Sequence, residues 1–203
     1  MTMDTDEALA RRLSDDLDNS FEALVLAHQD RLYTIANRFL GNAHDAEEAA
    51  QDALVRAYRA MAGYDTDRIR ALQLRPWLAT IVLNLCRNRL ARAQGARGTL
   101  SLDREPPEGG TVREPAADPS AGPAASLDRR EARRRWAELV VQLPPVYRAP
   151  VVLRHVDGLS YPELAIALDR PEGTVKAQVH RGLALLRTAF EASEHPEREE
   201  MTA

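Results

Sequence analysis

The segment 172–187 combines an apolar stripe with polar and basic side chains that could contact DNA. An apolar residue recurs every three or four positions, which predicts an amphipathic helix. These apolar positions are Val175, Val179, Leu183 and Leu186. The other side of the helix carries Thr174, Lys176, Gln178 and Arg181. Lysine and arginine bind phosphates or guanine, glutamine can pair with adenine, and threonine can bond a base or touch a thymine methyl.

A second short helix is predicted directly before this one. Ser160 and Glu163 have the spacing of a capping box, and Pro162 fits the first turn of a helix. Residues 169–171, Asp-Arg-Pro, end that helix. Two short helices joined by a tight turn form a helix-turn-helix, whose second helix enters the major groove of DNA. The pattern alone also fits an ordinary helical hairpin, so both interpretations stay open.

The charges are distributed unevenly along the chain, whose net charge is −4. Residues 41–55 contain acidic side chains and no lysine or arginine, whereas residues 66–93 and 129–192 are net basic. Basic faces attract phosphates, and an acidic face suits a basic protein. We therefore expect two kinds of partner, one of them nucleic acid.

The composition and periodicity predict an all-α protein with two small helical domains. Of the 203 residues, 44% are hydrophobic but only 5% are aromatic, which favours helices over a β-rich fold. The first domain is predicted at 20–93 and the second, which contains the helix-turn-helix, at 129–190. Pro150 interrupts an apolar helical pattern in the second domain and is expected to kink that helix.

The domains are predicted to be joined by a flexible linker at 94–128. This segment is rich in Pro, Gly, Ser and Ala and has no sustained apolar period. Such a segment buries too little surface to offset its ordering entropy, so we expect the two domains to orient independently. Residues 191–203 are predicted to form an acidic tail.

The sequence predicts neither an enzyme nor a metal or cofactor site. No nucleophile–base set is recognisable, and the histidines are scattered. Cys86 has no second cysteine as a partner and is expected in the core. The N-terminus lacks the features of a secretory signal, and no apolar run is long enough to span a bilayer. We therefore expect a cytoplasmic protein without membrane insertion.

The sequence from 143 to 187 closely resembles the −35-binding domain of sigma factors of the extracytoplasmic-function group. The strongest matches are Leu143-Pro144, Leu153-Arg154 and the stretches 158–161, 163–165 and 173–176. Residues 21–58 and 76–90 resemble the other domain of that group, which binds RNA polymerase and the −10 element. The resemblance covers about 20–93 and 129–190 in the family's order. It implies a sigma factor that binds core RNA polymerase and directs promoter recognition and transcription initiation.

The resemblance implies roles for residues of the first domain. The segment that docks on the basic clamp helices of the polymerase's largest subunit corresponds to Asp45, Glu48, Gln51 and Asp52. The loop that captures an unstacked −10 base corresponds to residues 64–75, and Asn84 matches a family asparagine at that pocket. For each acidic residue, a solvated helix face is the alternative.

Further −10 contacts are expected from one aromatic residue and from the basic end of the same helix. Tyr64 is a candidate for stacking on a base, whereas Trp77 begins an apolar stripe and is expected in the core. Contacts to the promoter backbone are expected from Arg87, Arg89 and Arg92. Solvated charge at a helix end explains these arginines equally well.

In the second domain, the resemblance implies −35 contacts along the recognition helix. The residues concerned are Thr174, Lys176, Ala177, Gln178, His180 and Arg181. Many relatives continue Gly-Thr-Val-Lys with Ser-Arg, where this chain has Ala177-Gln178. The family's −35 base preferences therefore do not carry over directly to this chain.

The expected partners are core RNA polymerase, promoter DNA and a dedicated anti-sigma factor. The main alternative is a stand-alone helix-turn-helix regulator that binds operator DNA. The acidic segment 45–52 argues against it, because a simple regulator has no need of such a helix. A third possibility is a protein-binding module, either an anti-sigma antagonist or a helical scaffold, which the basic recognition helix disfavours.

Overall fold

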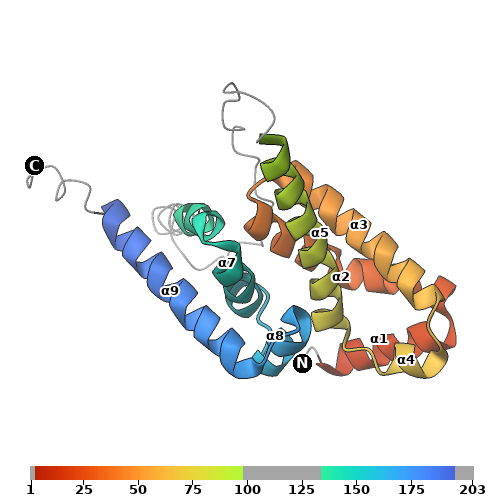
Figure 1. The fold of residues 1–203 in the computed structure, drawn as a ribbon. Coiled ribbons are helices and arrows are strands. Elements are labelled where there is room, and N and C mark those ends of the chain that lie inside the picture. Colours follow the sequence, from red (N-terminus) through yellow and green to blue (C-terminus); the bar gives the residue numbers. More distant parts are fainter. Residues whose placement is uncertain (1–2, 98–133, 195–203) are drawn as a thin grey trace, which may run out of the picture.

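The computed structural model describes residues 3–97 and 134–194, and within these ranges it contains helices and turns without a strand (Figure 1). The predicted all-α class is confirmed. The first domain comprises α1 (Met3–Asp15), α2 (Leu17–Leu40), α3 (Ala43–Ala62), α4 (Thr66–Arg70) and α5 (Leu74–Arg97). The second comprises a helix over residues 134–142, α7 (Pro145–Val151), the π-helix η1 (Val152–Val156), α8 (Tyr161–Leu168) and α9 (Glu172–Glu194). Most of the expected linker and acidic tail, residues 98–133 and 195–203, lies outside the described residues.

Helices α2, α3 and α5 form the core of the first domain, and α1 packs against α2 and α4. The inner face of α3 is built from small side chains, which allow close approach of the neighbouring helices. These are Ala46, Ala49, Ala50, Ala53 and Ala57, all buried. Cys86 is buried as expected. Tyr58 is 37% exposed, and its hydroxyl donates to Asp18 at 2.6 Å.

Local residues explain where α2 and α3 end and begin. Gly41 follows α2 with a φ of +73°, in the left-handed region that glycine adopts without a Cβ clash. Asn42 begins α3, and its side chain accepts a hydrogen bond from the N–H of Asp45 at 3.0 Å. Gly63 follows the last residue of α3. These residues determine where α3 begins and ends.

The second domain places α8 and the first turns of α9 around a core that also includes α7 and η1. Pro150 lies near the end of α7, and the helix continues past it as the wider π-helix η1; Pro150 has no N–H for the regular ladder. Gly182 on α9 allows close contact with α7, because a Cβ there would lie 2.5 Å from Val151 Cγ2. The predicted capping box of Ser160 and Glu163 is present at the start of α8.

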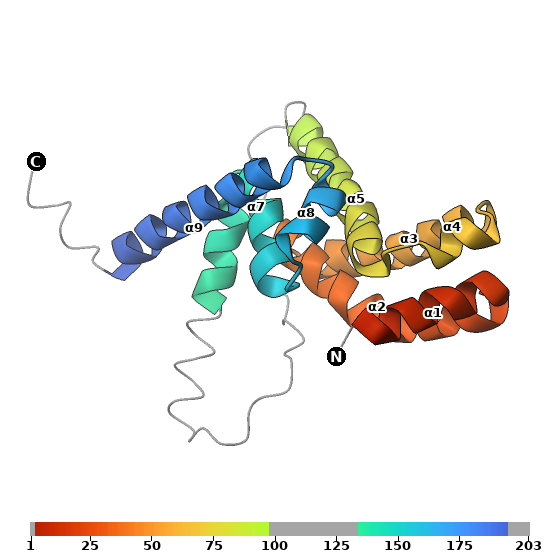
Figure 2. The ribbon, with the colours of Figure 1, turned by 90° about the horizontal axis from the view of Figure 1, so that it is seen from below.

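The two domains pack against each other, although the sequence predicted independent orientations (Figures 1 and 2). Helix α8 contacts α5, and η1 contacts α2. The buried guanidinium of Arg148 in α7 donates to the carbonyl of Phe39, near the end of α2, at 2.7 Å. Burial lowers the pKa of Arg148. This contact ties the second domain to unpaired carbonyl groups at the C-terminus of α2.

Replacing Ser160 with alanine is expected to destabilise the protein, because the N–H of Glu163 loses its capping acceptor. Loss of an N-cap side chain costs about 1 kcal/mol in free energy of unfolding. Urea denaturation followed by circular dichroism measures this change. Ser193→Ala is the matched control, since this exposed serine lies in the last turn of α9 and caps no N-terminus. Equal midpoints for the two variants would contradict the capping role.

Candidate nucleic-acid interface

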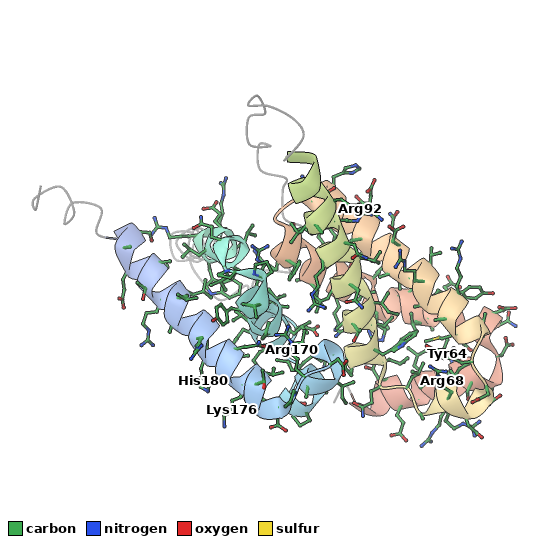
Figure 3. The ribbon with its side chains drawn as sticks, in the orientation of Figure 1. Tyr64, Arg68, Arg92, Arg170, Lys176 and His180 are labelled. Carbon is green, nitrogen blue, oxygen red and sulfur yellow. The ribbon has the colours of Figure 1, made fainter. Side chains whose placement is uncertain are left out.

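The recognition helix α9 presents its polar side to solvent, away from the first domain. Asp169 ends α8 in the left-handed region with a φ of 49°, which turns the chain into α9. The candidate contacts Thr174, Lys176, Ala177, His180 and Arg181 are exposed. Lys176 and His180 extend outward from α9 (Figure 3). These five predicted −35 residues therefore share one accessible face, as a helix entering a major groove requires.

Gln178 differs from its neighbours on α9. It is half-buried, and its side-chain oxygen is buried without a hydrogen-bond partner among the described residues. A buried amide oxygen without a donor is unfavourable. Reading of adenine by Gln178 would need the amide to turn outward, whereas Lys176 needs no such change.

The Tyr161 ring lies close to two basic side chains, one of which belongs to the recognition helix. The Lys176 ammonium lies 6.0 Å from the centre of the Tyr161 ring, and the Arg154 guanidinium lies 5.0 Å from it. Cations over a ring face are attracted by its quadrupole. Tyr161 therefore holds two positive charges near the N-terminal half of α9, where the helix dipole also favours a phosphate.

The acidic side of α3 is exposed but is paired within the chain. Glu48 and Asp52 accept hydrogen bonds from Arg89 of α5 at 2.7 and 2.9 Å. The hydrogen bond and charge of Arg89, with a smaller contribution from His44, lower the pKa of Glu48. The structure therefore brings together residues that the sequence assigned to two different partners, polymerase for the carboxylates and promoter DNA for Arg89.

A groove between α2 and α3 adjoins this acidic side. Its lining contains Gln29, Asp30, Tyr33, Glu47, Ala50, Gln51 and Leu54. Of these, the sequence had singled out Gln51 alone as a candidate contact. Leu26 precedes Gln29 and Asp30 by three and four residues, so it lies on the same side of α2, and it is 66% exposed.

Tyr64 lies between α3 and α4 and stacks within the chain. The Arg68 guanidinium lies 3.7 Å from the centre of the Tyr64 ring, and the Trp77 ring lies 6.3 Å away at a tilt of 58°. Trp77 is half-buried and packs on the core. Arg68, which the sequence did not single out, therefore covers one face of Tyr64 and offers a positive charge beside it (Figure 3).

On α5, Asn84 and Arg87 contact each other, whereas Arg89 contacts α3. The exposed Asn84 accepts a hydrogen bond from Arg87 at 3.1 Å. Burial, and then the positive charge of Arg170, lower the pKa of Arg87. Residues two positions apart on a helix point to opposite sides, so Arg89 faces α3. Arg92 is exposed near the C-terminal end of α5 (Figure 3).

Among the described residues, no group of three or more His, Cys, Asp or Glu side chains is placed to hold a metal ion. No helix in these ranges has the length and apolar character needed to cross a bilayer.

Replacing Lys176 with alanine is expected to weaken binding to a promoter duplex and to flatten its salt dependence. Loss of one phosphate contact reduces the slope of log K against log[salt] by about one. Fluorescence anisotropy at several salt concentrations measures both quantities, with a duplex chosen by mapping transcript 5′ ends. Arg134→Ala serves as the control, because this exposed arginine lies on another helix of the same domain. An unchanged slope for Lys176→Ala would exclude a phosphate contact.

Comparison with known proteins supports both domains. The family model for Sigma-70 region 2 matches residues 24–96, and that for Sigma-70, region 4 matches residues 133–186. The ECF RNA polymerase sigma factor SigW of Bacillus subtilis is 31% identical over 169 residues, covering 83% of this chain and 88% of that protein. The ECF RNA polymerase sigma factor SigE of Mycolicibacterium smegmatis is 34% identical over 168 residues, covering 83% of this chain and 60% of that longer protein.

Two solved structures share the fold. CnrH in complex with the cytosolic domain of CnrY has a TM-score of 0.62 at 24% identity, covering 92% of this chain and 97% of that chain. The sigma factor RpoE in complex with the anti-sigma factor NepR, from Bartonella quintana, has a TM-score of 0.58 at 20% identity, covering 84% and 96%.

Proposed function

Because this chain belongs to the extracytoplasmic-function group of the sigma-70 superfamily, whose members bind core RNA polymerase and direct promoter recognition, we propose a division of roles among its surfaces. The acidic side of α3 binds polymerase, the polar face of α5 and the Tyr64 region bind the −10 element, and α9 binds the −35 element. One observation carries the proposal: acidic and basic faces lie on separate helices of one chain. The presence of both domains favours this function over a stand-alone regulator.

The polymerase-binding role of α3 is supported by charge and accessibility. Glu48, Gln51 and Asp52 are exposed, and Asp45 is half-buried at the start of the same helix. The adjoining α2–α3 groove supplies apolar and hydrogen-bonding groups beside the carboxylates. A basic helix of the polymerase can therefore pair with the carboxylates while its other side chains fill the groove.

The −10 role uses two separate features of the first domain. The half-buried Tyr64 ring can contact an unpaired base with its exposed part, and the Arg68 charge beside it suits the adjacent phosphate. The Asn84 amide can exchange its bond with Arg87 for bonds to a base edge. Holding an unstacked base in this way drives strand opening by binding energy.

Three further features complete the proposal. The protein does no covalent chemistry of its own and acts as a specificity subunit. It works in the cytoplasm, where the polymerase and the template are. An anti-sigma factor inhibits it; the similarity in fold to RpoE in complex with the anti-sigma factor NepR supports this partner.

The test is transcription with purified components. The chain mixed with core polymerase is expected to yield promoter-specific transcripts from genomic templates. Glu48→Lys combined with Asp52→Lys is expected to abolish these transcripts and to weaken core binding, because two basic side chains then face the basic clamp helices. Run-off transcription and native gel shift with core enzyme measure the two effects.

The control carries the same change in net charge on other surfaces. Glu22→Lys combined with Glu138→Lys reverses two exposed carboxylates, one in each domain, and leaves α3 intact. This variant should transcribe like the unaltered protein. Absence of promoter-specific transcripts with the unaltered chain would overturn the proposed function, whereas equal loss in both variants would overturn the assignment to α3.

Arg89 is expected to compete with polymerase for the same carboxylates. Arg89→Met removes this competitor from Glu48 and Asp52 and should tighten core binding about two- to fivefold, since exposed ion pairs are weak. Fluorescence anisotropy with labelled protein measures the change. Arg12→Met on α1 controls for the loss of one exposed arginine. Weaker core binding by Arg89→Met would show instead that Arg89 positions the carboxylates.

A further inference from the structure

Two arginines, one from each domain, lie close to each other where α5 meets the turn between α8 and α9. The Thr80 hydroxyl of α5 lies 3.1 Å from the Ala167 carbonyl of α8, within donating distance. Arg87 follows Thr80 by seven residues, or about 10 Å along α5, and Arg170 follows Ala167 by three. Figure 2 shows α8 and the turn after it beside α5. Burial, and then the positive charge of Arg170, lower the pKa of Arg87.

Neither guanidinium has a carboxylate partner within the described part of the chain. Arg87 donates to the side-chain oxygen of Asn84 at 3.1 Å, and no carboxylate contributes to the shift in its pKa. The ion pairs of the described residues do not include Arg170 either, although Asp169 and Glu172 are close to it in sequence. Two like charges therefore lie near each other without a neutralising group from the chain.

Another arginine contact at the same interface has its counter-charge. Both carboxylate oxygens of Asp157, which follows η1, accept from Arg31 of α2. The Arg75 guanidinium, in the first turn of α5, donates to the Asp157 carbonyl at 2.6 Å. The second domain thus supplies a carboxylate at the start of α5 but a further positive charge, Arg170, farther along the same helix.

The backbone that carries Arg170 is well defined. The residue lies between Asp169, which has a φ of 49°, and Pro171, whose ring fixes its own φ. The Arg170 N–H donates to the Ala165 carbonyl at 3.1 Å. On the other side, Arg87 extends from the middle of α5 and is held by its bond to Asn84. A ligand that binds both arginines therefore has little backbone to order.

The groups available at this place are hydrogen-bond donors. The Asn84 oxygen is occupied by Arg87, which leaves the NH₂ group of the amide. Each guanidinium also has N–H groups without an acceptor among the described residues. The planar fork of arginine matches the oxygens of a phosphate group, and a doubly charged phosphate neutralises two guanidinium groups. A metal cation would be repelled by the same two charges.

From these contacts we propose that Arg87, Arg170 and Asn84 form a binding site for a phosphate group, carried by the free ion or by a small nucleotide. The site is shared between the domains, since each supplies one guanidinium. Sequence reasoning did not single out Arg170, because its partner is a distant residue of the other domain. The site belongs to the free chain and does not depend on the proposed function, so neither polymerase nor promoter enters its test.

Titration of the full chain with inorganic phosphate, followed by NMR of the arginine side chains, tests the proposal. Phosphate should shift the Nε–H signals of Arg87 and Arg170 with one common dissociation constant, because one ion contacts both. Sodium chloride at equal ionic strength is the reference, since screening is common to both salts. The exposed Arg134, which pairs with Glu138 on another helix, should not respond.

Arg87→Gln and Arg170→Gln should each weaken phosphate binding by about tenfold or more, because each removes a charged donor. Arg170→Lys keeps the charge and should bind phosphate more tightly than Arg170→Gln. The matched control is Arg134→Gln, which removes an exposed arginine of the second domain and should bind phosphate like the unaltered chain. Circular dichroism verifies that each variant keeps its helices.

Adenosine monophosphate and adenosine distinguish the two sources of the phosphate group. Tighter binding of the monophosphate than of inorganic phosphate assigns the site to a nucleotide, and equal or weaker binding assigns it to the free ion. Binding of adenosine as tightly as its monophosphate would overturn the proposal. So would a shift at only one of the two arginines, an equal response to chloride, or unchanged phosphate affinity in either glutamine variant. Promoter-specific transcripts alongside such a result would retain the proposed function and remove only this site.

Discussion

Opposite charges within one chain attract each other, and this constraint governs the arrangement of the protein's surfaces. In the proposed division of roles, carboxylates bind a basic protein partner, and guanidinium or ammonium groups bind DNA. Both sets occur here within a small molecule, and both are partly engaged with each other. Arg89 binds Glu48 and Asp52, and Arg31 binds Asp157. Other groups of both signs are exposed, among them Glu47 on α3 and Lys176 and Arg181 on α9.

The two internal ion pairs differ in solvent access, and this difference determines what each can do. The Glu48 and Asp52 side chains are 48% and 55% exposed, so water and salt screen their attraction to Arg89. The two carboxylates can therefore exchange Arg89 for a competing basic group at little cost in free energy. Arg31 and Asp157 are 15% and 1% exposed, so their attraction is screened much less. Removing either partner while the other stays buried leaves a charge without its counterion.

Local features of the fold were predictable from the sequence because their causes lie within a few residues. The capping box of Ser160 and Glu163, the helix end at Gly41 and the outward polar face of α9 follow from short spacings. The distant pairs were not predictable. Arg89 lies 41 residues from Glu48, and Arg31 lies 126 residues from Asp157. No periodicity relates such positions, since helix packing and domain packing decide which side chains meet.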